Sequence, residues 1–228
     1  ELELPDKLPF HEVKMYKRES MKYTSSFDIV ELSMKARVEL MGIDQDQQWL
    51  IYLLAASAGL RRNEIDKLTW SQIDFSKNTI NLEATIYFKP KSVNSGTLVS
   101  IDSDLTEMLR GYRARIKGEF VIEETIAPRL KSKVAHYRAN RHFNALNKWL
   151  KDNGVDDRKP LHTLRKEAGS LVNEKDGLYA ASHFLRHADI QVTAAHYVDN
   201  KKTITSGLGA IMAGKVEPIT KDKEKTHG

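Results

Sequence analysis

Two short patterns place charged side chains at helical spacing. Arg61 and Glu64 are three residues apart, and so are His162 and Arg165. If these segments are helical, each pair lies on one helix face. Guanidinium groups present rigid forks of N–H donors that suit phosphate or carboxylate oxygens. His162 and Arg165 could therefore bind one anion together, although this spacing alone is more often a coincidence. Glu64 would ordinarily complete a helix-capping box beside a solvated Arg61.

A further pattern combines histidine and tyrosine. His183 and His187 have the i,i+4 spacing of some metal ligands, but no Glu completes an HExxH motif and no third ligand is evident. We therefore expect no metal site. Leu185-Arg186-His187 is followed by Tyr197, ten residues after the second histidine. A tyrosine hydroxyl can act as a nucleophile, yet a tyrosine on an amphipathic helix is more often a half-buried core residue.

The composition excludes several classes of site. The 228 residues include no Cys, which rules out disulfides, Cys-based zinc sites, iron–sulfur clusters and thiol nucleophiles. No apolar run approaches the roughly 20 residues that a membrane-spanning helix needs, so we expect no membrane partner. The net charge of +5 is small, and it indicates a polyanionic partner only where it is clustered.

Such a cluster lies between residues 125 and 151, which contain no acidic side chain. A solvated helix face normally mixes charges of both signs, so an acid-free stretch favours a surface that faces phosphates. From this stretch we expect DNA contacts by Arg129, Lys131, Lys133, Arg138 and Arg141.

Hydrophobic periodicity predicts a chain of helices. The first begins after Ser25-Ser26, which we expect to cap it, and the second should be buried on all sides and end at Gly59. The predicted helices span residues 27–40, 44–59, 61–68, 103–116, 140–152, 161–174, 176–185, 189–198 and 204–213.

Only the middle of the chain reads as β-structure. Strands are predicted at residues 79–83, 85–88 and 97–101, with a turn before the last one. The fold class is thus mainly α with a small antiparallel β-sheet (α+β). We expect a linker from a missing N-terminal DNA-binding domain at residues 1–24, a catalytic domain at 25–213 and a disordered tail at 214–228.

Taken in order, these motifs resemble the catalytic domain of the tyrosine recombinase (phage integrase) family over roughly residues 25–210. The family's motifs are an Arg after Gly-Leu, a Lys in a β-turn, HxxR, LxH and a nucleophilic Tyr. The resemblance implies a catalytic set of Arg61, Lys91, His162, Arg165, His187 and Tyr197, supported by Glu64. Lys89 is the alternative to Lys91 in the same turn.

Two departures from the family pattern concern the last motifs. The family commonly has Gly between the Leu and the His, and Arg186 takes that place here. The spacing from His187 to Tyr197 is ten residues, where nine is usual. We expect Arg186, together with Arg62 and Lys89, to contact DNA.

The resemblance implies a site-specific recombinase or integrase of a mobile genetic element. It would cleave and rejoin double-stranded DNA through a 3′-phosphotyrosine, without metal, ATP or another cofactor, and act in the cytoplasm of a bacterial host or be phage-encoded. Self-association into a tetramer on DNA is expected, and the helix at residues 204–213 could dock on a neighbouring protomer or fold back on its own. The alternatives are a type IB topoisomerase and a catalytically silent DNA-binding regulator.

Overall fold

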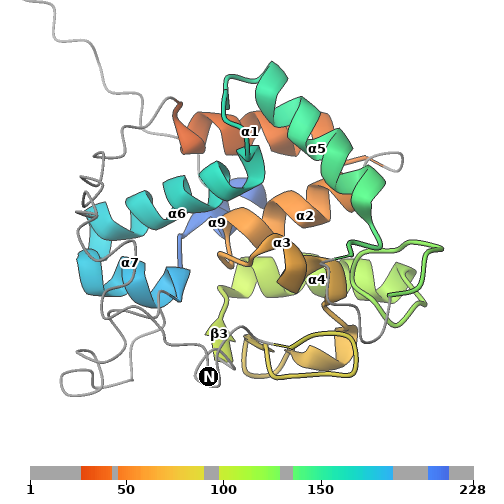
Figure 1. Cartoon of the computed structure of the whole chain (residues 1–228). Coiled ribbons are helices and arrows are strands. Elements are labelled where there is room, and N and C mark those ends of the chain that lie inside the picture. Colours follow the sequence, from red (N-terminus) through yellow and green to blue (C-terminus); the bar gives the residue numbers. More distant parts are fainter. Residues whose placement is uncertain (1–26, 43–45, 90–97, 129–135, 187–204, 216–228) are drawn as a thin grey trace, which may run out of the picture.

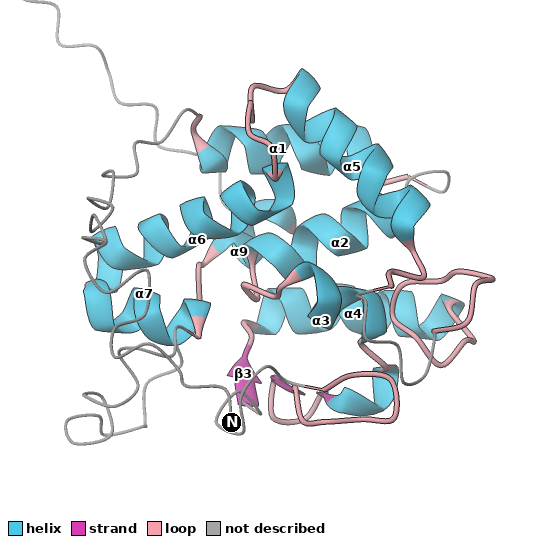
Figure 2. Cartoon of the chain, viewed as in Figure 1, coloured by secondary structure: helices cyan, strands magenta, loops and turns pink. Residues whose placement is uncertain are grey.

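The computed structural model is mainly helical, with its strands confined to one edge of the molecule (Figures 1 and 2). This arrangement confirms the predicted fold class. The structure describes residues 27–42, 46–89, 98–128, 136–186 and 205–215. The helices are α1 (Ile29–Leu40), α2 (Asp46–Ala56), α3 (Arg62–Lys67), α4 (Ser103–Arg115), α5 (Asn140–Asp152), α6 (Pro160–Asp176), α7 (Leu178–Leu185) and α9 (Leu208–Met212).

The core forms around α2, in which every residue from Trp49 to Ala56 is buried. The uninterrupted apolar run predicts this burial, because a helix that is apolar all round must be covered on every side. Helices α1, α5, α6 and α9 supply the cover. The buried Tyr52 hydroxyl lies 3.0 Å from Ser33 Oγ on α1, so its polar atom is hydrogen-bonded inside the core.

Helix α1 is capped by a residue other than the predicted one. Asp28 is the N-cap, and its Oδ1 accepts hydrogen bonds from the backbone N of Val30 at 2.7 Å and of Glu31 at 3.2 Å. The cap predicted at Ser25-Ser26 is therefore wrong. Asp and Ser are almost equally good N-cap residues, so residue type alone does not identify the cap. The cap is the residue directly before the first helical turn.

The sheet consists of β1 (Ile73–Asp74), β2 (Thr79–Asn81) and β3 (Leu98–Ser100), all antiparallel in the order β1-β2-β3. Buried Ile80 pairs with Ile73 on one side and Val99 on the other. The strand predicted at residues 85–88 is wrong: the Thr85 hydroxyl accepts hydrogen bonds from the backbone N of Tyr87 and Phe88, which makes a turn.

Helices α6 and α7 pack against each other closely through a glycine. A Cβ placed on Gly169 of α6 would lie only 2.5–3.1 Å from three side-chain atoms of Leu185, the last residue of α7. The absence of a side chain at Gly169 thus sets how near the end of α7 comes to α6.

Helix α9 folds back onto its own chain. It contacts α1 and α4, and its Leu208 and Met212 are fully buried. Its Gly209 approaches Asp102 so closely that an added Cβ would overlap the carboxylate, and Lys215 forms an ion pair with Asp104. Of the two dockings considered for this helix, the structure has the one within the same chain.

Gly169→Ala should destabilise the protein although it adds a good helix former. Overpacking against Leu185 costs about 1–3 kcal/mol, which exceeds the gain of about 1 kcal/mol in helix propensity. The control is Gly111→Ala in α4, where an added Cβ meets nothing within 4 Å. This substitution should raise the free energy of unfolding by about 1 kcal/mol. Urea denaturation measures both; equal stabilisation would show that the α6–α7 contact is loose.

Candidate active site

The bend between α2 and α3 brings Arg61 to the end of α7. Gly59 has φ +59°, and a Cβ there would lie 2.9 Å from Phe184 Cε1 and 3.1 Å from the Phe184 carbonyl oxygen. Both the left-handed backbone and the close approach require glycine. The chain then enters α3, with Arg61 as its N-cap residue.

Glu64 holds Arg61 through both of its carboxylate oxygens. Oε2 accepts from the Arg61 backbone N at 2.7 Å, and Oε1 accepts from Arg61 Nη1 at 3.0 Å. The Glu64 side chain is buried, and that of Arg61 is 41% exposed. Glu64 therefore completes the helix-capping box that the spacing predicts, and it also orients the Arg61 guanidinium.

Arg165 reaches the same place from α6. Its Nε donates to the Gly59 carbonyl at 2.7 Å, and its Nη2 donates to the Leu185 carbonyl. Arg61 Nη2 donates to the same Leu185 carbonyl at 3.2 Å. Burial, with Arg61 and Arg186 nearby, lowers the pKa of Arg165 to about 9. Two guanidiniums from distant helices thus converge on one oxygen atom.

Arg186 does not lie where a DNA contact is expected. Its side chain is buried, and Nη2 donates to Glu64 Oε2 at 2.6 Å and to the Gly59 carbonyl at 2.9 Å. Its backbone has φ 51° and ψ 53°, the left-handed region that glycine adopts easily. Sequence reasoning recognised the missing glycine but gave no signal that the side chain would turn inward.

His162 lies one helical turn before Arg165 on α6, and its side chain is exposed. Partial burial and the charges of Lys166 and Arg165 lower the pKa of its imidazole. At neutral pH the imidazole is therefore mainly unprotonated, the form that can accept a proton.

Several predicted residues fall outside the described part of the chain. Lys89 is described and exposed. The residues whose position the structure does not describe are Lys91, Arg129, Lys131, Lys133, His187 and Tyr197.

The predicted DNA contact at Arg138 is also misplaced, because this residue is only 2% exposed. Its Nη1 donates to the Ile122 carbonyl at 2.7 Å and to the Asp66 carbonyl at 3.2 Å, and its guanidinium lies 4.1 Å from the Phe120 ring centroid. Arg138 therefore holds the chain before α5 against α3.

Two further basic residues are engaged within the protein. Arg62 lies over the rings of Tyr137 and Phe143, at 4.2 and 4.8 Å, and donates to Asn140 at 2.6 Å. Exposed Arg141 donates from Nε to Glu124 at 2.8 Å, just before the acid-free stretch.

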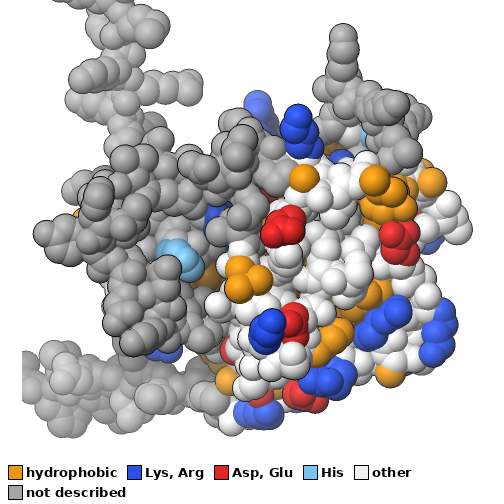
Figure 3. Space-filling view, turned by 90° about the horizontal axis from the view of Figure 1, so that it is seen from below, with side chains coloured by type: hydrophobic (Ala, Val, Ile, Leu, Met, Phe, Trp, Pro, Cys, Tyr) orange, Lys and Arg blue, Asp and Glu red, His pale blue; other side chains and the backbone are white. Residues whose placement is uncertain are grey.

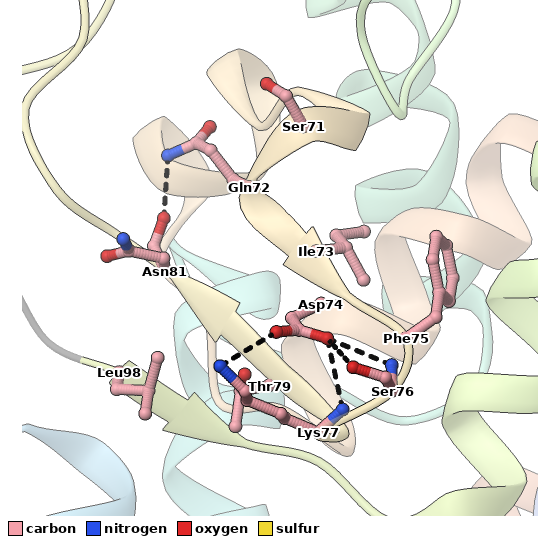
Figure 4. Close-up of a pocket in the computed structure, with 10 residues that line it drawn as sticks. All are labelled: Ser71, Gln72, Ile73, Asp74, Phe75, Ser76, Lys77, Thr79, Asn81 and Leu98. Atoms are coloured by element: carbon pink, nitrogen blue, oxygen red, sulfur yellow. Dashed lines mark hydrogen bonds and ion pairs between the residues drawn. The ribbon is translucent and has the colours of Figure 1, made fainter.

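Surface charge is mixed on the sheet side of the molecule. On the face that Figure 3 shows, described basic and acidic side chains are interspersed. A hollow of about 550 Å³ lies beside the sheet (Figure 4). Its Asp74 accepts hydrogen bonds from Ser76 Oγ at 2.6 Å and from the backbone N of Ser76 and Lys77, so the carboxylate stabilises the β1–β2 turn.

Two features of other protein classes are absent from the part of the chain that the structure describes. No group of three or more potential ligand side chains in that part of the chain could hold a metal ion. None of the helices formed by those residues is long and apolar enough to cross a membrane.

Glu64→Gln should lower the free energy of unfolding by about 3 kcal/mol, because it leaves buried guanidinium donors without their counter-charge. The matched control is Glu107→Gln, which removes an exposed pair with Arg110 and should change stability by no more than about 0.5 kcal/mol. Urea denaturation compares the variants. Equal effects would mean that Glu64 does not hold the site together.

The His162 imidazole should titrate below its usual value of 6.5 in the free protein. The unfolded chain then binds the extra proton first, so this group makes the fold less stable as pH falls below 6.5. Lys166→Gln removes a nearby positive charge and should raise the midpoint, whereas Lys151→Gln on α5 should leave it unchanged. An NMR titration of the imidazole measures the midpoint, and a value at or above 6.5 contradicts the expectation.

The chain is similar to known proteins in both sequence and fold. Residues 32–203 match the model of the phage integrase family. A tyrosine recombinase XerC-like protein of Caldanaerobacter subterraneus subsp. tengcongensis is 27% identical, over 67% of this chain and 46% of that protein. The chain thus spans about half the length of this curated relative.

Two solved structures share the fold. The crystal structure of XerA recombinase has a TM-score of 0.51 at 16% identity, covering 78% of this chain and 61% of that one. The Tn1549 transposon integrase in complex with transposon right end DNA has a TM-score of 0.55 at 14% identity, covering 80% and 64%. The matched family model, the relative and the fold together show that this chain belongs to the phage integrase family of tyrosine recombinases.

Proposed function

We propose that this chain is the catalytic part of a site-specific DNA recombinase that cleaves and rejoins double-stranded DNA through a 3′-phosphotyrosine. The observation that carries the proposal is the convergence of Arg61 and Arg165 on the single carbonyl oxygen of Leu185. Donors that reach one oxygen together can also bind a non-bridging phosphate oxygen, where a phosphoryl-transfer transition state accumulates negative charge.

The proposed reaction is an exchange of phosphodiester bonds. The Tyr197 hydroxyl attacks phosphorus, the bond from phosphorus to O5′ breaks, and the protein becomes linked to the 3′-phosphate. His162 accepts the tyrosine proton, Lys91 protonates the departing O5′, and His187 donates a hydrogen bond to a phosphate oxygen. A new 5′-hydroxyl then reverses the step. Because one phosphodiester replaces another, no ATP is consumed.

DNA as the substrate is supported by a structural relative. The Tn1549 integrase has been solved with circular-intermediate DNA and with transposon right end DNA. We extend DNA binding to this chain, and with it self-association into a tetramer on DNA. Because Arg138 and Arg186 are buried, the described basic residues that we retain as DNA contacts are Lys89, Arg141 and Arg62, which are exposed or partly exposed.

Tyr197→Phe should abolish covalent attachment to DNA, because it removes the nucleophilic oxygen. The probe is a pool of randomised duplexes, each with a nick that lets the cleaved strand end diffuse away, and adducts are detected on denaturing gels. Tyr179→Phe is the matched control, since that exposed tyrosine on α7 should leave adduct formation unchanged.

The same pool separates the competing functions. An adduct that survives in Tyr197→Phe would refute the nucleophile assignment, and no adduct with the parent protein would favour a silent DNA-binding regulator. Relaxation of supercoiled plasmids without strand exchange between two duplexes would indicate a topoisomerase instead.

A further inference from the structure

The guanidinium of Arg186 has no role in the chemistry described so far, yet it lies within the cluster that performs it. The side chain is only 5% exposed, and its Nη2 is 2.6 Å from Glu64 Oε2. Burying a charged group is costly unless its surroundings compensate it. The burial of the Arg186 charge therefore needs a reason other than filling space in the core.

The contacts of Arg186 close a ring with Arg61. Arg61 Nη2 donates to the Arg186 carbonyl at 2.9 Å, and Arg186 Nη2 donates to Glu64 Oε2. That same oxygen accepts from the Arg61 backbone N at 2.7 Å, while the other carboxylate oxygen accepts from Arg61 Nη1 at 3.0 Å. The backbone of Arg186 thus contacts the Arg61 guanidinium directly, whereas its side chain acts on Arg61 through the Glu64 carboxylate.

Arg186 also shares an acceptor with Arg165. The Gly59 carbonyl accepts from Arg165 Nε at 2.7 Å and from Arg186 Nη2 at 2.9 Å. This carbonyl belongs to the bend that aims Arg61. One side chain therefore joins the end of α7 to the bend and to the start of α3.

The charge balance of the cluster depends on the same residue. Arg61, Arg165 and Arg186 surround the single carboxylate of Glu64. Because Arg186 takes part of that carboxylate, Glu64 cannot fully neutralise Arg61. The positive potential that remains is directed at the carbonyl oxygens to which the Arg61 guanidinium donates. A phosphate oxygen bound in their place would be stabilised by this potential.

The backbone at this position does not itself require arginine. The left-handed conformation of Arg186 suits glycine, which family members commonly have here, and it is unfavourable for a side chain with a Cβ. Glycine would make the same turn without that cost, so the side-chain contacts are what arginine contributes.

We propose that Arg186 is a positioning residue, which aims the Arg61 guanidinium at the reacting phosphate and keeps it from being neutralised by Glu64. This inference rests on the proposed function, and it assigns Arg186 no contact with DNA. Its partners are the Glu64 carboxylate and the Gly59 carbonyl.

The test measures the single-turnover rate of adduct formation and the DNA dissociation constant, with a nicked duplex recovered from the randomised pool. Arg186→Met and Arg186→Gly should both slow cleavage by roughly 100-fold, the effect of misplacing a catalytic group, with unchanged DNA affinity. Arg186→Lys keeps the charge and should fall between these variants and the parent. Arg110→Met, an exposed guanidinium on α4, should leave the rate unchanged.

Two results separate positioning from a purely structural role. If Arg186→Gly cleaves as fast as the parent, arginine only shapes the turn and the inference is overturned. In an Arg61→Lys background, Arg186→Met should cause little further loss, because both changes disable the same guanidinium. Losses that multiply would instead show that Arg186 acts independently of Arg61.

A binding measurement without cleavage keeps the two proposals distinguishable. Inorganic phosphate is titrated into the protein while the Arg61 Nε–H signal is followed by NMR, and Arg186→Met should weaken binding roughly tenfold. If the parent forms no adduct but phosphate binding depends on Arg186, the proposed function fails and the positioning role stands. If the parent forms the adduct and Arg186→Met matches it in both assays, the positioning role alone fails.

Discussion

The arrangement of the site depends on one buried carboxylate, that of Glu64. Its two oxygens are shared between Arg61, the N-cap residue of α3, and Arg186 at the end of α7, two positions far apart in the sequence. A buried ion pair stabilises a fold little in net terms, because desolvation offsets much of the attraction. Its value lies in geometry, since removing one member leaves the other charges uncompensated and free to reorient.

The apolar core makes this polar cluster possible. Helix α2 is buried from Trp49 to its end at Ala56, before the predicted end at Gly59. Gly59 lies in the bend that follows, and its carbonyl accepts from two guanidiniums. At the end of α7, the Leu185 side chain fills the space that Gly169 leaves open, and the Leu185 carbonyl accepts hydrogen bonds from Arg61 and Arg165. Packing of apolar groups thus positions the carbonyl oxygens, and these oxygens position the guanidiniums.

Sequence patterns predicted the features that depend on local spacing. The bounds of α5 follow from its amphipathic repeat, and the three-residue spacings of Arg61 with Glu64 and of His162 with Arg165 identified the helices that meet at the cluster. The predictions failed where two local structures are both compatible with the sequence. Asp28 caps α1 in place of the predicted serines, and the Thr85 hydroxyl makes a turn at residues 85–88 in place of the predicted strand.

Long-range contacts explain the remaining differences. Counting charges along the chain cannot show that Arg138 meets the carbonyls of Asp66 and Ile122, or that Arg186 turns toward Glu64. In both cases the partners come from segments distant in sequence. The absence of acidic residues from this stretch therefore does not show which of its basic side chains lie at the surface. Some of them pack inside the protein and others contribute to the surface charge.

The docking of α9 on its own chain has a consequence for the proposed nucleophile. Both Arg186, which follows α7, and Ser206, which precedes α9, are buried in the same body. Tyr197 is joined to Arg186 by eleven residues, which can span at most about 40 Å when fully extended. Because both anchors belong to one chain, the proposed attack would join Tyr197 to a phosphate held by the arginines of its own chain.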